Sequence, residues 1–340
     1  MRVLKWLAIA LVALVAGVVG VGLLLPDHVH VERSVIVNTK PATAYVVLNG
    51  FRQFNRWSPW AELDPNAQYS IEGPLLGVGA KSSWVSEDPN VGAGSQEIIE
   101  AVPYERIRVR LVFSGFDSEN YATYQLTPEG EGTRIVWAYD STFHGDLMGR
   151  YFGLMMDKFI GADYEKGLAK LKPLLESLPQ DDLTAMPIEL VRTVAKPIAY
   201  ISGQTTAAQA ESALSGAYAQ IQAYFAAHGM QAAEQPLALT RHFDDATKMW
   251  SFDAAMIPDR TDAPTPDGNG IRLGTLYAGD ALRVEHKGAY VDLDAAYQLL
   301  IAYKMVAGFD DNGDSWEHYL SNPGNAEPAA QVTQVYWPVK

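Results

Sequence analysis

The stretch GRYFGLMMDKFIGADYEKGLAKLK, residues 149–172, decides the fold of the first half of the chain. Its apolar residues recur at helical spacing, with lysine and glutamate between them. We therefore expect one long helix from about residue 149 to 177, whose inward stripe includes Met155, Met156 and Phe159. The apolar positions that define the period are Phe152, Met155, Met156, Phe159, Ile160, Leu168 and Leu171.

Strand-like runs precede this helix. The run HVHVERSVIVN, which begins at His28, alternates between polar and apolar residues, and five later runs are separated by Gly, Pro, Asn or Asp. This pattern predicts an antiparallel meander whose curved sheet the long helix covers. Six aromatic residues of this half either line a cavity between sheet and helix or fill an ordinary core, which is the simpler expectation. They are Trp57, Trp60, Trp84, Tyr124, Trp137 and Phe143.

A polar, proline-bounded segment, SLPQDDLTAMP at residues 177–187, separates the two halves. We predict an N-terminal helix over 1–26, a first domain over 27–178, a linker over 179–186 and a second domain over 187–340. In the second domain the order strand, helix, strand, strand occurs twice, and its strand ends Pro258 and Pro338 lie 80 residues apart. The register predicts a duplicated β-α-β-β unit, so the fold class of the whole chain is α+β.

The N-terminus carries an uncharged run from Trp6 to Leu25, which follows Arg2 and Lys5. Twenty helical residues rise about 30 Å, the thickness of the bilayer hydrocarbon. The positive-inside rule places the N-terminus in the cytoplasm and the two domains outside it, in the periplasm of a Gram-negative cell. A cleaved signal peptide is the alternative, but its apolar region is usually shorter, and Gly20–Gly22 is a weak cleavage site. We predict an uncleaved single-pass anchor through residues 6–25.

Composition excludes several classes of function. The 26 basic and 40 acidic residues give a net charge of -14, which would repel a phosphate backbone, so we predict no nucleic-acid partner. The absence of cysteine removes disulfides, thiolate metal sites and cysteine nucleophiles. The histidines are dispersed, and the GVGAKSS run lacks the spacing of a phosphate loop. We predict no metal, no cofactor and no catalytic residue.

The candidate ligand site lies near the C-terminus, in the strand-like stretch WEHYL at residues 316–320. Alternation along a strand places Glu317 and Tyr319 on the same face. A carboxylate among aromatic rings suits a cationic or a flat apolar molecule. The predicted ligand-binding residues are Glu317, Tyr319, Tyr336, Trp250, Tyr290 and Tyr200.

Residues from about 29 to 178 resemble the polyketide cyclase/dehydrase branch of the START-like superfamily. The resemblance is carried by ERSVIVNTKPATAYVVLNGFRQFNRWSPWAELDP, by GVGAKSSWVSEDPNVGAGSQEIIE and by the helix quoted above. It implies a helix-grip fold, in which a curved sheet wraps around the long C-terminal helix and encloses a cavity for lipids or other hydrophobic molecules. It carries over no catalytic motif.

Residues from about 186 to 340 resemble the gyrase-inhibitor-like domain, which is also the effector-binding half of multidrug-responsive transcription activators. The segments that carry this resemblance are KPIAYISG, HKGAYVDLDAAYQLL, WEHYLSNP and QVYWPV. The resemblance implies that a glutamate in the penultimate strand reads cationic drugs, and Glu317 occupies the matching place. No helix-turn-helix region precedes the domain, which argues against a transcription factor.

These observations predict a membrane-anchored protein that binds small hydrophobic or cationic molecules in two cavities. An enzyme, either a small-molecule hydrolase or a cyclase, is the first alternative, and it would use Glu317 as general base beside a tyrosine such as Tyr319. An envelope interaction module, which uses both domains as surfaces, is the second.

Overall fold

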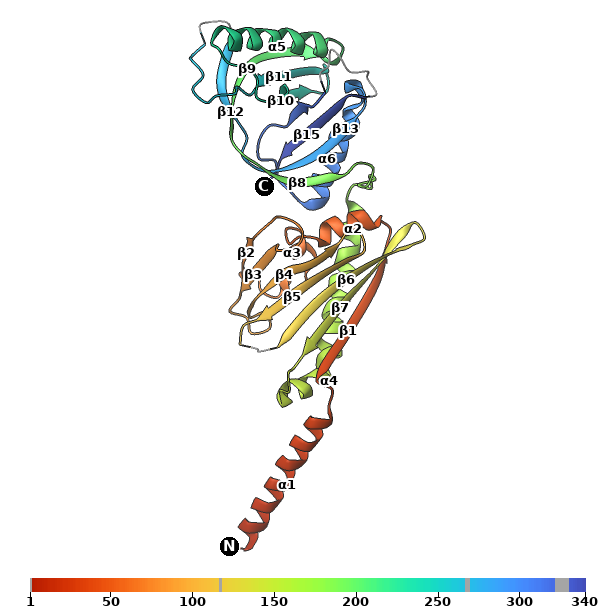
Figure 1. Ribbon diagram of the computed structural model, residues 1–340. Helices are drawn as coiled ribbons and strands as arrows, with labels where there is room; N and C mark the ends of the chain where they lie inside the picture. The colour runs from red at the N-terminus through yellow and green to blue at the C-terminus, as the bar shows by residue number, and fades with distance from the viewer. Residues whose placement is uncertain (1, 116–117, 267–269, 322–329) are drawn as a thin grey trace. The chain divides into compact units, whose positions relative to one another are not determined.

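The computed structural model describes residues 2–115, 118–266, 270–321 and 330–340. The chain forms two compact units, Met1–Gln180 and Asp181–Lys340. Each unit contains a curled antiparallel sheet with helices packed on it (Figure 1), so the α+β fold class is confirmed. The end of the WEHYLSNP segment, from Asn322, lies outside the described residues.

The first unit begins with helix α1 (Arg2–Leu24). Its residues Val3–Leu24 have a mean hydropathy of 2.8, so the helix is long and apolar enough to cross a membrane, by length and composition. Almost none of this segment is buried within the chain, unlike the core helix of a water-soluble domain. The helix is therefore a candidate for a membrane anchor or a signal sequence.

The sheet of the first unit has the strand order β1-β7-β6-β5-β4-β3-β2, and all neighbouring strands are antiparallel. Three short helices, α2 (Pro41–Leu48), α3 (Phe54–Trp57) and η1 (Trp60–Glu62), connect the first two strands. Helix α4 (Leu147–Ser177) lies along the curled sheet (Figure 1), as expected for a helix-grip fold. The strands are β1 (His28–Val37), β2 (Gln68–Glu72), β3 (Lys81–Val85), β4 (Ala93–Val102), β5 (Arg106–Phe113), β6 (Glu119–Glu129) and β7 (Gly132–Thr142).

The C-terminal half of α4 forms the core of this unit. One helical stripe, Tyr164, Leu168, Leu171 and Leu175, is buried against the sheet. The ring of Tyr164 stacks on that of Trp137 with centroids 3.7 Å apart and an interplanar angle of 10°. The helix and the sheet are thus joined by an aromatic contact as well as by aliphatic packing.

The N-terminal half of α4 differs from the prediction. Met155 and Phe159, which we expected on the inward stripe, are 48% and 55% exposed, and Met156 is only half-buried. The step of five residues from Phe159 to Tyr164 turns the helix by about 140°, so the two apolar stripes lie on nearly opposite faces. Glycines 149 and 153 form the inner face of this half, against the ring of Phe143.

The sheet of the second unit has the order β12-β9-β11-β10-β14-β15-β13-β8. Helices α5 (Ala210–Ala227) and α6 (Asp294–Ala307) pack on it, each preceded by a 3-10 turn, η2 (Ala207–Gln209) or η3 (Tyr290–Asp292). The strands are β8 (Ile188–Thr193), β9 (Lys196–Thr206), β10 (Leu237–Asp244), β11 (Met249–Met256), β12 (Ile271–Leu276), β13 (Gly279–Lys287), β14 (Trp316–Tyr319) and β15 (Val332–Pro338).

This strand order is that of a duplicated unit. When each of β8 to β11 is replaced by its counterpart among β12 to β15, and the reverse, the strand order reads backwards. The segment that leads each copy, expected as one strand, forms two, and the outer strand of each copy pairs with the other copy: β8 with β13, and β12 with β9. The copies meet where Ala238 on β10 lies opposite Glu317 on β14. These two residues are 79 positions apart, so Glu317 sits at the pseudo-two-fold axis.

Candidate functional site

Glu317 is the buried carboxylate of the second unit. It lies in the middle of the short strand β14 and is only 7% exposed. The hydroxyl of Tyr297, from α6, donates a hydrogen bond of 2.9 Å to its Oε1, and the hydroxyl of Tyr319 donates to its Oε2. Each carboxylate oxygen therefore holds one phenol donor, and the expected pairing of Glu317 with Tyr319 on one face is present.

Burial raises the pKa of Glu317 above its usual value, because the charged form loses its hydration, while the hydrogen bonds from Tyr319 and Tyr297 act in the opposite direction. Burial, followed by the field of the carboxylate, also raises the pKa of both tyrosines well above 10. Both phenols thus keep their protons at neutral pH and remain donors. Among the described residues, no lysine or arginine forms an ion pair with Glu317.

Further tyrosines surround the carboxylate. Tyr218, from α5, belongs to the same core cluster as Tyr319, and its hydroxyl donates a 2.8 Å hydrogen bond to the carbonyl of Leu237. Tyr290 packs its ring edge-to-face on Tyr319, with centroids 5.1 Å apart. The charge of Glu317 contributes to the raised pKa of both Tyr218 and Tyr290, after burial. A cage of phenol rings therefore encloses one carboxylate.

The six predicted site residues separate into two groups. Tyr319 bonds to Glu317 and Tyr290 packs on Tyr319, so the structure brings these two to the carboxylate. Trp250 packs against the same hydrophobic cluster, where its ring contacts Phe252 and its indole N–H donates to Thr240. Tyr336 lies opposite Trp316 in the strand register and stacks on it at 4.7 Å. Because Trp316 precedes Glu317 in the strand, Tyr336 lies on the other face of the sheet. Tyr200 also packs there, against the hydrophobic cluster that contains Trp316.

Sequence reasoning missed Tyr218 and Tyr297. The two residues are 79 positions apart, the same interval that relates Ala238 to Glu317, so they are equivalent in the duplicated unit. That interval is the signal that identifies them: each copy contributes one tyrosine from its helix to the pseudo-two-fold axis. Only the second copy carries a carboxylate there.

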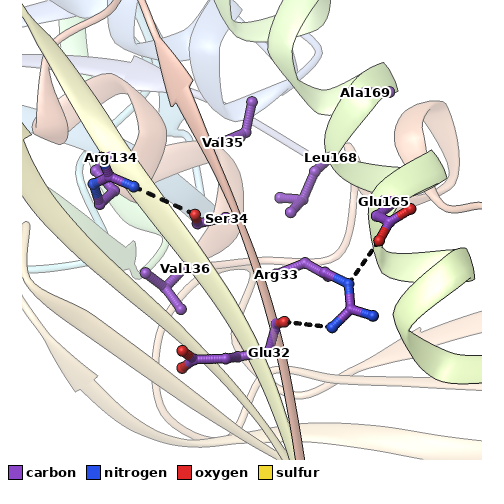
Figure 2. A pocket seen from close by; sticks show the side chains of 9 residues that line it. All are labelled: Glu32, Arg33, Ser34, Val35, Arg134, Val136, Glu165, Leu168 and Ala169. Atoms are coloured by element: carbon purple, nitrogen blue, oxygen red, sulfur yellow. Dashed lines mark hydrogen bonds and ion pairs between the residues drawn. The ribbon is translucent and has the colours of Figure 1, made fainter. Parts of the chain in front are cut away.

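The first unit has an open groove along its edge strand β1. The groove, of about 650 Å³, lies between β1 and α4, where Arg33 donates a hydrogen bond of 2.7 Å to Glu165 (Figure 2). Charged residues on an open edge do not match a hydrophobic ligand cavity. The groove is lined by Glu32, Arg33, Ser34, Val35, Arg134, Val136, Glu165, Leu168 and Ala169.

The aromatic residues expected either to line a cavity or to fill a core in this unit largely pack on one another. Trp57 contacts Trp137 edge-to-face at 5.2 Å, and Tyr124 stacks on Trp137 at 5.5 Å. Trp84 lies apart, beside Phe113. The described residues also contain no group of three histidine, aspartate or glutamate side chains placed to hold a metal ion.

The folds define the class of protein as two α+β domains joined in one chain. Residues 28–176 match the family described as polyketide cyclase / dehydrase and lipid transport, and residues 186–340 match the GyrI-like small molecule binding domain. Each match covers less than half of the chain, and the two lie one after the other along it. No curated protein matches the chain.

Solved structures are similar to one unit or the other. The C-terminal domain of EcmrR is 17% identical, covering 46% of this chain and 98% of that one, with a TM-score of 0.40. A hydrolase from Listeria innocua is 14% identical over 45% of this chain and 91% of its own, with a TM-score of 0.35. The di-domain ARO/CYC StfQ of the steffimycin biosynthetic pathway is 15% identical over 44% and 51%, with a TM-score of 0.34. EcmrR has also been seen bound to DNA.

Proposed function

We propose that this chain is a membrane-anchored binding protein for small hydrophobic or cationic molecules, and that the second unit binds a cation at Glu317. The observation that carries the proposal is a buried carboxylate whose hydrogen-bond donors, among the residues that the structure describes, are phenol hydroxyls. An ionised carboxylate without a cationic partner is costly to bury. A bound organic cation would remove that cost and would also gain from the surrounding aromatic rings.

The family match supports a small molecule as the partner. Glu317 is covered by Tyr297 and Tyr319, so a cation reaches it only when at least one phenol moves aside. We expect Tyr297 to move, because it lies on helix α6, whereas Tyr319 is held in the strand register opposite Thr333.

The direct test uses two isosteric probes, benzyltrimethylammonium and uncharged neopentylbenzene, titrated against the full chain in detergent. Substitution Glu317→Gln keeps the shape and removes the charge. We expect it to weaken the cation by on the order of 1 to 3 kcal/mol, the range of a charge-assisted contact, and to leave the neutral probe nearly unchanged. Glu285→Gln, an exposed glutamate of the same unit, is the matched control.

Equal affinities of the native chain and Glu317→Gln for both probes would remove the assignment. The enzyme alternative predicts a different result, since a hydrolase needs a water beside Glu317 as general base and yields a product from a candidate ester or epoxide. An interaction module predicts binding of neither probe. Product formation and probe binding thus separate the three classes.

We further propose that α1 is an uncleaved anchor that holds both units outside the cytoplasm. Its apolar length and the basic residues Arg2 and Lys5 ahead of it support this orientation. Protease added to the outer face of the membrane should then digest the bulk of the chain. A chain that is protected from outside protease, or whose mature N-terminus lies near Leu23, would contradict the anchor.

A further inference from the structure

The N-terminal half of α4 exposes an apolar stripe that the fold does not use. Met148, Phe152, Met155 and Phe159 follow one another at steps of four, three and four residues, so they lie on one face of the helix. Their exposed fractions are 65%, 57%, 48% and 55%. A row of four large apolar side chains in water is unusual for a water-soluble domain and indicates a contact surface.

The stripe lies beside the end of α1. The hydroxyl of Tyr151, in the first turns of α4, donates a hydrogen bond of 2.5 Å to the carbonyl of Val18. The guanidinium of Arg150 donates to the carbonyls of Leu23 and Leu25 at 3.1 and 3.0 Å. Val18 is six residues before the end of α1 at Leu24, about 9 Å along the helix axis. The start of α4 is therefore attached alongside the last turns of the apolar helix.

The apolar character of this face stops at a definite point. Beyond Phe159 the same face of α4 carries Asp163 and Lys166, which form an ion pair at 3.2 Å. The apolar part from Met148 to Phe159 is about 16 Å long. This face of the helix is thus apolar near α1 and charged farther along, as expected for a helix that passes out of a lipid interface into water.

We propose that the Met148–Phe159 face of α4 lies in the outer interface of the bilayer that α1 crosses, in contact with lipid. The proposal rests on the anchor proposed above, and it adds a second membrane contact that holds the first unit against the lipid surface. Lipid is the occupant that the attachment to α1 favours, because the anchor carries this face to the membrane whether or not a protein partner is present. The net charge of -14 opposes anionic lipids, so the contact is apolar rather than electrostatic.

The absence of cysteine makes the test direct, because a single introduced cysteine labels one position. The full chain is reconstituted in phosphatidylcholine vesicles, with or without doxyl-labelled acyl chains, and an environment-sensitive dye is attached at Met155→Cys or Phe159→Cys. Lys166→Cys, on the same face beyond the stripe, is the matched control, and Leu14→Cys reports on the anchor. We expect severalfold stronger quenching at 155 and 159 than at 166, and strong quenching at 14.

Each other outcome is distinct. Quenching at 14 with none at 155 or 159 overturns the lipid contact and leaves the anchor intact. Quenching at 155 and 159 without quenching at 14 keeps the lipid contact and removes the anchor. A dye at 155 that is shielded from water but not quenched by lipid, and that becomes exposed as protein is diluted in the vesicles, shows that a second copy covers the face and overturns the proposal.

Discussion

Two buried carboxylates of the second unit, Asp253 and Glu317, have different hydrogen-bond partners. Asp253, on β11, is 3% exposed and accepts hydrogen bonds from Arg241 at 2.7 Å and from Ser202 at 2.5 Å. Glu317 is 7% exposed, and within the described part of the chain it accepts hydrogen bonds from two phenol hydroxyls. The first carboxylate already has its cation within the chain, whereas the second has donors but no countercharge among the described residues.

This difference separates a structural ion pair from a candidate site. The Arg241 guanidinium also bonds to Asp314, so the Asp253 pair forms part of a small network. A carboxylate that the fold itself neutralises gains little from an added cation. A carboxylate held only by neutral donors gains most, which is why the binding proposal concerns Glu317 and not Asp253.

The largest expected effect comes from making Asp253 resemble Glu317. Substitution Arg241→Gln removes the countercharge and leaves a buried carboxylate with neutral donors. We expect the unit to lose about 2 kcal/mol of stability, below the full cost of breaking a buried pair, because Arg241 is 41% exposed. Hydrogen exchange of the β9 and β11 amides, followed by mass spectrometry of the full chain in detergent, measures the change.

Arg192→Gln is the matched control for that experiment. Arg192 pairs with Asp280 but is 78% exposed, so its loss should cost less than about 1 kcal/mol. Similar losses for both variants would show that burial of Asp253 does not matter and that the comparison with Glu317 has no energetic basis.

A smaller effect is expected from pH. The pKa of Glu317 is raised in the folded chain, so the folded state binds more protons than the unfolded state between pH 4.5 and the raised value. Stability due to this group is therefore present at low pH and declines as pH rises through that window. Glu317→Gln has no such slope. Its stability relative to the native chain should grow across the window by about 1.4 kcal/mol for each unit of elevation.

The same exchange measurement at several pH values, read on the β14 and β10 amides, gives this difference. A constant difference between Glu317→Gln and the native chain would mean that the pKa of Glu317 is not raised. In that case the two phenols compensate fully for burial, and the carboxylate has no unmet need for a cation.

Local periodicity predicted much of this molecule. The strand period placed Glu317 and Tyr319 on one face, and the 80-residue interval predicted the duplication that the strand order confirms. The helical period predicted α4 but not which of its faces is buried, because the helix carries two apolar stripes with the same period. The five-residue step from Phe159 to Tyr164 predicts a rotation of about 140° between the two stripes. Only the packing of Gly149 and Gly153 on Phe143 shows which stripe faces inward.

Local sequence patterns did not predict which tyrosines surround Glu317. Tyr336 and Tyr200 are tyrosines like the neighbours of Glu317, but they lie on the other face of the sheet. Tyr297 contacts the carboxylate from helix α6. By itself the sequence determined the apolar N-terminal helix, the α+β class, the duplicated unit and the pairing of Glu317 with Tyr319, because those depend on backbone periods. Tertiary structure alone decided which phenols enclose the carboxylate, that Arg241 neutralises Asp253 and that one stripe of α4 stays exposed, because those depend on how helices dock on a curled sheet.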